Sequence, residues 1–356
     1  MATFTNRIIY QSQAVAMRIG SSPAAVVAQN LYPWVVLNGV QSVNYGAEVA
    51  REDVFQFGKL TAADRVILET PVATAEVSMH YPNGSILAVD FSHLLEASIA
   101  GWASSELVIA LDKESEDFAS TADVSTVTLQ SANMSSFNFE ASVGAMPTLT
   151  LGFEGTSLSY STVAAPALGG PFGIAGTVVD PTASFSTNLI PFTGVIVQIL
   201  DEYSGFFTNS QSATLSFDLG FEGLQKLGSA QGLQYARLAT LPASASLDVE
   251  GLAINHGMSI TLSDMFQRAG SATVASHMRQ GARKNVSLIL TNASTASVNG
   301  IAQPGTVHTT MQLQNATLDS SNYSASLGDN ATCSATFGVS ISALNPSASE
   351  SALKFF

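Results

Sequence analysis

The chain has 356 residues and a mass of 37.0 kDa, a length that suits two domains of ordinary size. Its 13 basic residues stand against 27 acidic ones, and the net charge of -14 argues against binding to nucleic-acid phosphates, which relies on lysine and arginine. The single cysteine, Cys333, excludes an internal disulfide framework and a cysteine-based zinc site.

The start of the chain carries no targeting signal. Residues 1–28 lack the apolar block of a secretory signal peptide, and their apolar side chains predict either a first strand or an arm that reaches a neighbouring molecule. The longest apolar runs, such as residues 195–200, are far shorter than the roughly 20 residues of a membrane-spanning helix. We therefore expect cytoplasmic synthesis and no membrane insertion.

Alternation of apolar and polar residues predicts an all-β fold. The clearest case is residues 72–81, which divide into an apolar and a polar face: Ala75, Val77, Met79 and Tyr81 against Thr74, Glu76, Ser78 and His80. Similar patterns predict strands at 125–129, 148–153, 245–249, 286–291, 309–313 and 331–341. Two segments differ, 90–104 and 262–285, because each has an Asp or Ser cap before a run of apolar residues. Each is expected to contain a helix.

The chain also repeats its own pattern. Residues 129–144 (LQSANMSSFNFEASVG) align with residues 313–328 (LQNATLDSSNYSASLG), and about ten of roughly 25 positions are identical when the alignment extends to Phe153 and Phe337. Earlier landmarks follow in the same order: Glu52 with Glu222, Gly58 with Gly228, Pro71 with Pro242, Ser92 with Ser263, and residues 107–111 with 286–290. The growing offset indicates insertions in the second copy.

These landmarks predict two tandem copies of one domain. The first spans residues 1–165, including the N-terminal segment 1–28, and the second spans residues 175–345. A linker rich in Pro and Gly, residues 166–174, separates them, and residues 346–356 form a C-terminal tail. The alternative is one large β domain with a single repeated hairpin.

No motif indicates catalysis, a cofactor or a metal. The sequence has no G-x-S-x-G elbow and no complete phosphate-binding loop, and its five histidines lack the close pairs of zinc sites. We therefore expect a protein that is not an enzyme and has no cofactor. A three-histidine site assembled in space is the alternative.

Opposite charges occupy comparable places in the two copies. The second helical segment and its exit carry basic residues and the exit of the first carries acidic ones: Arg268, Arg279, Arg283 and Lys284 against Asp112, Glu114, Glu116 and Asp117. If assembly sets copies side by side, these groups are candidates for inter-subunit pairing, because complementary charges select partners. Two independently solvated loops are the alternative.

Several segments together resemble the major tail tube protein of tailed bacteriophages. They are residues 40–45 (VQSVNY) with acidic residues after them, 55–58 (FQFG), Thr70-Pro71 with the alternating strand to Tyr81, and the closing stretch from 324–329 (SASLGD) to Phe337. The resemblance implies two tandem β-sandwich or half-barrel domains, each with one flanking helix. It also implies that three chains form a ring with pseudo-sixfold symmetry, and that stacked rings form the tail tube of the virion.

The resemblance further implies the partners of such a tube. These are other copies of the chain, the tape-measure, tail terminator and baseplate proteins, and DNA that passes through the lumen without specific binding. An acidic wall would repel phosphates within a Debye length of about 8 Å at physiological salt. The candidate acids facing the lumen are Glu76, Asp248 and Glu250. Deletion of residues 1–28 is expected to abolish polymerisation.

Three other classes of protein remain open at the level of sequence, and one of them, a small-molecule or glycan-binding sandwich, has no evident aromatic platform. An outer-membrane β-barrel fits the terminal Phe355-Phe356 and the alternating strands, but the chain has only two Trp and eight Tyr for aromatic girdles. Another virion structural component, such as a baseplate or decoration protein, fits the all-β polar character equally well.

Overall fold

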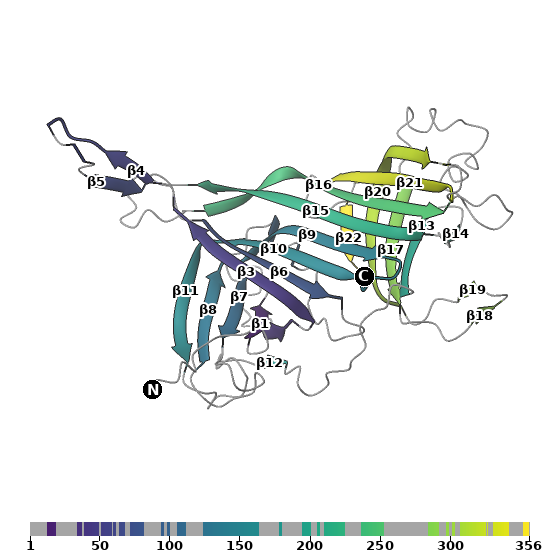
Figure 1. The fold of residues 1–356 in the computed structure, drawn as a ribbon, viewed down its shortest axis with the longest axis horizontal. Helices are drawn as coiled ribbons and strands as arrows, with labels where there is room; N and C mark the ends of the chain where they lie inside the picture. Colours follow the sequence, from purple (N-terminus) through teal and green to yellow (C-terminus); the bar gives the residue numbers. More distant parts are fainter. Residues whose placement is uncertain are drawn as a thin grey trace.

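The computed structural model describes residues 13–18, 34–37, 39–49, 51–58, 60–61, 64–67, 72–81, 94–95, 98–99, 105–111, 124–163, 178–179, 194–200, 205–206, 210–224, 236–252, 284–291, 297–298, 301–302, 307–324, 326, 330–341 and 352–355. In these residues the chain is almost entirely β-strand (Figure 1), which confirms the all-β expectation. α-Helical backbone within them is confined to residues 94–95 and 98–99, inside the first segment expected to contain a helix.

The smaller of two large sheets has six strands in the order β11-β8-β7-β1-β2-β12. Their bounds are β1 Gln13–Arg18, β2 Trp34–Val36, β7 Glu106–Leu111, β8 Val124–Gln130, β11 Ser157–Val163 and β12 Val178–Val179. All neighbours are antiparallel except β12 and β2.

The larger sheet has twelve strands, in the order β14-β13-β17-β20-β21-β16-β15-β9-β10-β6-β3, and β22 pairs with β20 beside this path. From the first half of the chain come β3 Val40–Glu48, β6 Val72–His80, β9 Asn133–Ser142 and β10 Thr148–Gly155. From the second half come β13 Val195–Leu200, β14 Gly205–Phe206, β15 Ser210–Leu224, β16 Ala236–Leu252, β17 Lys284–Thr291, β20 Val307–Ser324, β21 Thr332–Ile341 and β22 Ala352–Phe355.

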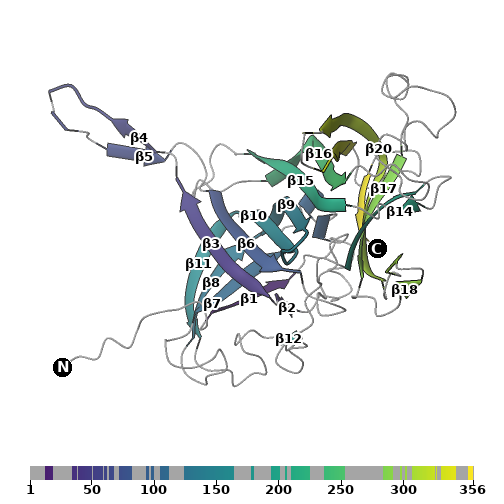
Figure 2. The ribbon, with the colours of Figure 1, turned by 45° about the vertical axis from the view of Figure 1, so that its right-hand side comes forward.

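Two short hairpins complete the strands. The pair β4 Arg51–Val54 and β5 Asp64–Ile67 projects far from the body in both views (Figures 1 and 2). The pair β18 Ser297–Val298 and β19 Ile301–Ala302 lies after β17.

One contiguous core of apolar side chains runs through both halves of the chain. It contains the side chains that the alternation of residues 72–81 assigns to the apolar face, Ala75, Val77, Met79 and Tyr81, and all are buried. Its fully buried aromatic side chains include Phe137, Phe139 and Phe153. Burial of a phenylalanine of this kind stabilises the fold by about 1.5–3 kcal/mol, because its apolar area leaves water.

The same order of strand pairings occurs in both halves of the chain. In the first half, β3 pairs with β6, β6 with β10, β10 with β9, β1 with β7, β7 with β8 and β8 with β11. In the second half, β15 pairs with β16, β16 with β21, β21 with β20, β13 with β17, β17 with β20 and β20 with β22. The single strand β20 takes the places of both β8 and β9.

The registers repeat as well as the order. Leu107 lies opposite Leu129, and in the second half Val286 lies opposite Leu313, as the sequence landmarks align them. The β-bulges recur too. One lies at Gln41 in β3 and again at Gln211 in β15, and another lies at Ser135 in β9 and again at Asp319 in β20.

The two halves meet through a pair of strands rather than through side chains alone. β9 of the first half pairs with β15 of the second in an antiparallel register that runs from Ser142 opposite Ser212 to Ser136 opposite Asp218. This junction makes the sheet continuous across the halves (Figure 1).

Strands form at all the predicted positions, and several extend beyond the predicted limits. Residues 13–18 are a first strand, since β1 pairs with β7 and β2 and buries Val15, Ala16 and Met17. Residues 352–355, assigned to a C-terminal tail by the sequence analysis, form β22 on β20, because burial of Leu353 and Phe355 favours sheet pairing. The linker 166–174 and residues 262–283 of the second helical segment lie outside the described residues.

Candidate functional site

The larger sheet has one apolar face and one polar face. Side chains on successive strand residues point to opposite faces, and in β6, β9, β10, β15, β16 and β21 one set is buried in the core. The other set consists mainly of Ser, Thr, Asn, Gly, Asp and Glu, and we call it the polar face. It crosses the junction between the halves without a break, because β9 and β15 are in register.

Rows of directly opposite residues define this polar face across both halves. One row consists of Asn44, Glu76, Gly152, Ser136, Asp218, Ser244 and Ser340. A second consists of His80, Thr148, Glu140, Thr214, Asp248, Thr336 and Ser320. In the second row Thr214 of β15 lies between Glu140 and Asp248, so the Cα atoms of the two acids are two strand spacings, about 10 Å, apart. The carboxylates are therefore spread over the face rather than gathered at one point.

Hydroxyl groups connect neighbouring strands of the polar face. The side-chain oxygens of Ser216 and Ser246 lie 2.8 Å apart, and the Thr336 hydroxyl donates a hydrogen bond to the carboxylate of Asp248. The Thr317 hydroxyl of β20 lies 3.3 Å from the Gly338 carbonyl oxygen of β21 and 3.1 Å from the Asp319 carboxylate of its own strand. Such bonds hold the polar side chains against the sheet.

The polar face is acidic. Its carboxylates are Glu76, Glu140, Glu154, Asp218, Asp248 and Glu250 on the central strands, with Asp319 at the bulge of β20. On these strand segments, as far as they are described, the face carries no lysine or arginine. Two ion pairs of the described residues lie elsewhere: Arg18 pairs with Glu106 in the smaller sheet, and Arg65 pairs with Asp53 in the projecting hairpin.

A broad hollow of about 440 Å³ lies in the polar face beside β3. It exists because Gly46 and Gly152 contribute no side chains there, whereas the corresponding positions of the second half hold Ser216 and Thr336. Space at Gly152 is limited all the same, since a Cβ added there would lie 2.2 Å from the Ser136 Oγ. The hollow is open to solvent, and its lining mixes polar groups, such as Asn44 and Glu76, with the rings of Tyr45 and Phe153.

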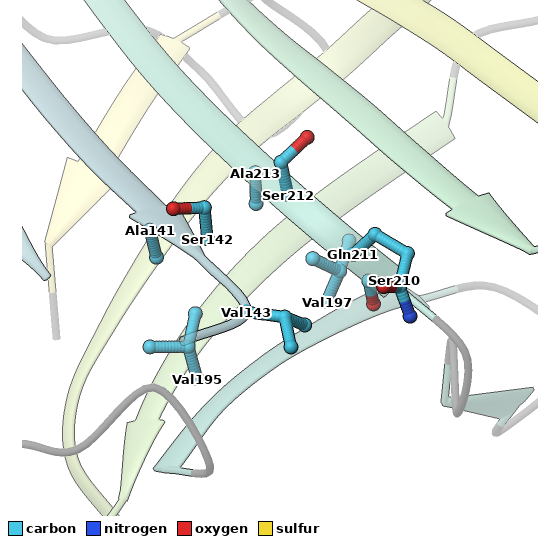
Figure 3. A pocket seen from close by; sticks show the side chains of 9 residues that line it. All are labelled: Ala141, Ser142, Val143, Val195, Val197, Ser210, Gln211, Ser212 and Ala213. Atoms are coloured by element: carbon cyan, nitrogen blue, oxygen red, sulfur yellow. The ribbon is translucent and has the colours of Figure 1, made fainter. Parts of the chain in front are cut away.

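A second, smaller hollow lies where the halves meet (Figure 3). The ends of β9 and β15 and the strand β13 line it with Ala141, Ser142, Val143, Val195, Val197, Ser210, Gln211, Ser212 and Ala213. Its volume of about 30 Å³ holds about one or two water molecules. The hollow is thus a packing feature of the junction.

The three acids predicted to face a lumen all lie on the polar face. Glu76 is exposed on β6, and Asp248 and Glu250 are exposed on β16. Sequence reasoning missed Glu140 and Asp218, which share this face. Their signal was available, because Glu140 follows Phe137 and Phe139 in an alternating run and Asp218 follows Leu215 and Phe217 in another.

The proposed charge pairing between subunits stays a prediction. Asp112, Glu114, Glu116, Asp117, Arg268, Arg279 and Arg283 lie outside the described residues, and only the backbone of Lys284 is described, at the start of β17. Among the described side chains, no three of His, Cys, Asp or Glu come together as a metal site. No helix in the described part of the chain is long and apolar enough to cross a membrane.

Comparison with known proteins gives matches to solved structures alone. No protein-family model matches the sequence, and no curated protein resembles it significantly. A chain of the virion of a native gene transfer agent particle is 17% identical, with a TM-score of 0.28, over 46% of this chain and 95% of that one. A chain from the tail of an empty gene transfer agent particle with C6 symmetry is 18% identical, with a TM-score of 0.28, over 46% of this chain and 96% of that one.

Proposed function

We propose that this chain is a structural protein of a virion tail, and that its copies stack as rings into a tube that conducts DNA during ejection. In this proposal each ring contains three chains and has pseudo-sixfold symmetry. The chain's role is structural rather than catalytic.

The observation that carries the proposal is the continuous two-faced sheet. One face supplies the core, and the other offers hydroxyl, amide and carboxylate groups across both halves. Lysine and arginine are absent from β6, β9, β10, β15, β21 and residues 238–252 of β16. A conduit for DNA needs such a wall, because cations would bind the phosphates that have to move past. Carboxylates spread over the face repel phosphates at every point along the path.

The repeated registers and bulges support the second element of the proposal, two copies of one unit in each chain. A protein with two equivalent units can occupy two of six equivalent positions in a ring, so three chains complete the circle. Strand edges buried between subunits also explain how an all-β chain with 11% charged residues avoids uncontrolled edge pairing.

Negative-stain electron microscopy of the purified full-length chain tests the proposal. We expect hollow tubes or stacked rings with a stain-filled centre. Particles that stay single and compact at high protein concentration, or filaments without a central channel, would contradict it.

A charge-reversal experiment tests the acidic lumen itself. Glu140→Lys combined with Asp248→Lys places two cations on the polar face, and tubes of this variant should retain linear DNA in a salt-sensitive way. Glu52→Lys combined with Asp64→Lys makes the same change in net charge at exposed residues of the projecting hairpin, away from the polar face. Equal DNA retention by both variants would contradict a lumen lined by the polar face.

A further inference from the structure

The junction between the halves joins one kind of edge to another. In the first half, β3 and β9 form the two edges of the group β3-β6-β10-β9, and in the second half β15 and the C-terminal part of β20 form the edges of β15-β16-β21-β20. The junction pairs β9 with β15, so the last strand of one group meets the first strand of the next. This contact is head-to-tail, which means that it uses two different surfaces.

In the described part of the chain, this contact leaves its two complementary edges unpaired, one in each half. Among the described strands, β3 pairs only with β6, and residues 317–324 of β20 pair only with β21. β3 corresponds to β15, with the same bulge at Gln41 as at Gln211, and residues 317–324 correspond to β9, with the bulge at Asp319 matching Ser135. One chain therefore presents two further edges that correspond to the two strands of its internal β9–β15 contact.

We infer that β3 of one chain pairs with residues 320–324 of β20 of a second copy, antiparallel and in the register of the internal β9–β15 junction. This inference rests on the proposed function and names the partner and register of its subunit contact. Transfer of the internal register places Asn44 opposite Ser324, Gly46 opposite Asn322 and Glu48 opposite Ser320 of the neighbouring chain. The corresponding internal pairs are Thr214 with Glu140, Ser216 with Asn138 and Asp218 with Ser136.

The composition of the two edges fits this register. The internal pair Asp218–Ser136 becomes Glu48–Ser320, and Ser216–Asn138 becomes Gly46–Asn322, so a carboxylate again faces a hydroxyl and the amide again faces a small residue. No two like charges lie opposite each other in these pairs, an arrangement that would weaken cross-strand pairing.

Burial gives a second reason for the inference. On β15 the apolar face buries Ala213, Leu215 and Phe217, with exposed fractions of 3%, 1% and 2%. The corresponding residues of β3 are not buried in one isolated chain: Tyr45 is 40% exposed, Ala47 is exposed and Val43 is half-buried. A strand laid beside β3 covers this apolar edge as β9 covers that of β15, and it satisfies the free backbone groups of both strands.

Cysteine cross-linking at paired positions tests the register. The variant Asn44→Cys/Ser324→Cys, in a Cys333→Ala background, should form disulfides between chains on mild oxidation, because directly opposite residues bring their Cβ atoms to about 4.5–5.5 Å. Six strands separate β3 from β20 in the sheet, so a bond between the two positions joins two molecules. A ring of three gives covalent trimers as the largest product on a non-reducing gel, and an open filament gives a longer ladder.

Two matched controls make the outcome decisive. Thr214→Cys/Glu140→Cys places the same pair at the internal junction and should form a bond within one chain. Asn44→Cys/Asn322→Cys shifts the pair by two residues, to about 7–8 Å, and should react at least tenfold less. The inference is overturned if the internal pair reacts and the Asn44–Ser324 pair does not, or if the shifted pair reacts better.

The microscopy tests the proposed function and the cross-linking tests the register, so a negative result in one does not decide the other. Hollow tubes without the Asn44–Ser324 disulfide overturn the register and leave the proposed function intact. Specific cross-links in assemblies that have no channel support the register and contradict the proposed function.

A charge variant adds a test without cysteine. Ser320→Glu sets a carboxylate opposite Glu48 of the next chain and should raise the protein concentration needed for assembly by about two- to fivefold. Ser340→Glu, an exposed position on β21 away from both edges, should leave this concentration unchanged. Equal effects of the two variants contradict the contact.

Discussion

Ser131 and Asn315 adopt the same left-handed backbone conformation at corresponding places in the two halves. Their φ angles are 52° and 55°, and among the described residues they are the only ones other than glycine with positive φ. Each directly precedes a buried alanine, Ala132 or Ala316. Before Ser131 the chain pairs with β7 and after it with β10. Before Asn315 the chain pairs with β17 and after it with β21. The left-handed residue thus turns the strand from one set of partners to the other.

Substitution at Ser131 tests the need for this turn. Ser131→Val should lower the free energy of unfolding by about 1–2 kcal/mol, because a β-branched residue is disfavoured at positive φ. Ser131→Gly accepts the conformation and should stay close to wild type. Denaturant titration measures both variants, and equal stability of the two would show that the turn needs no particular residue.

Tyr81 gives a pH dependence in the alkaline range. Burial raises its pKa to about 12, although a hydrogen bond from its hydroxyl to Thr309 lowers it. Because the pKa in the folded chain exceeds the usual 10, this contribution to stability is complete below pH 10 and is lost as the pH rises toward 12. Tyr81→Phe should remove this part of the loss of stability at alkaline pH. Thermal unfolding measured at about pH 9 to 12, the range around the ordinary pKa of tyrosine, checks this expectation. An unchanged pH profile would contradict the assignment.

Phe217 packs at the junction of the halves. It lies opposite Phe137 in the β9–β15 pairing and is only 2% exposed, while Phe137 contacts Phe355 edge-on at a ring distance of 5.3 Å. Phe217→Ala should lower the free energy of unfolding by about 3–5 kcal/mol, since it removes a large side chain from a core that both halves share. Tyr160→Ala, at a residue 69% exposed, is the control and should cost far less. Calorimetry of both variants tests the difference.

Two truncations at the N-terminus distinguish an effect on folding from an effect on assembly. Deletion of residues 1–18 removes β1, which buries Val15, Ala16 and Met17 against the core, and should abolish folding of the smaller sheet. Deletion of residues 1–12 leaves every described pairing of β1 in place. Circular dichroism of the two truncations tests this expectation. If the shorter truncation folds and does not polymerise, an arm function of residues 1–12 accounts for the loss.

Gly155 is held close to the backbone of its neighbour. A Cβ at this position would lie 2.6 Å from the Gln130 carbonyl oxygen and 2.6 Å from the Leu129 Cδ1. The backbone has to move to accept it, so Gly155→Ala should lower the unfolding free energy by about 1–3 kcal/mol. Gly220→Ala, where the nearest atom lies 3.6 Å away, is the control, and equal stability of both variants would contradict the steric argument.

Local pattern sufficed to predict several of the strands and, in residues 72–81, which side chains are buried. The alternation in residues 72–81 predicts the buried faces of Val77 and Met79, because a strand residue's face follows from its position alone. The segments 107–111 and 286–290, which are landmarks of the sequence repeat, also pair in equal registers in the two halves, since equal side-chain patterns select equal pairings.

The partners of the strands come from the tertiary structure. A strand's alternation does not specify which other strand lies beside it, because every strand offers the same backbone donors and acceptors. The folded chain therefore decides that β9 pairs with β15, that Glu140 and Asp218 share the polar face with Glu76, and that Ala352–Phe355 is a strand on β20. Among the described strands, it also decides that β3 pairs on one side alone, with β6, and that the end of β20 pairs on one side alone, with β21.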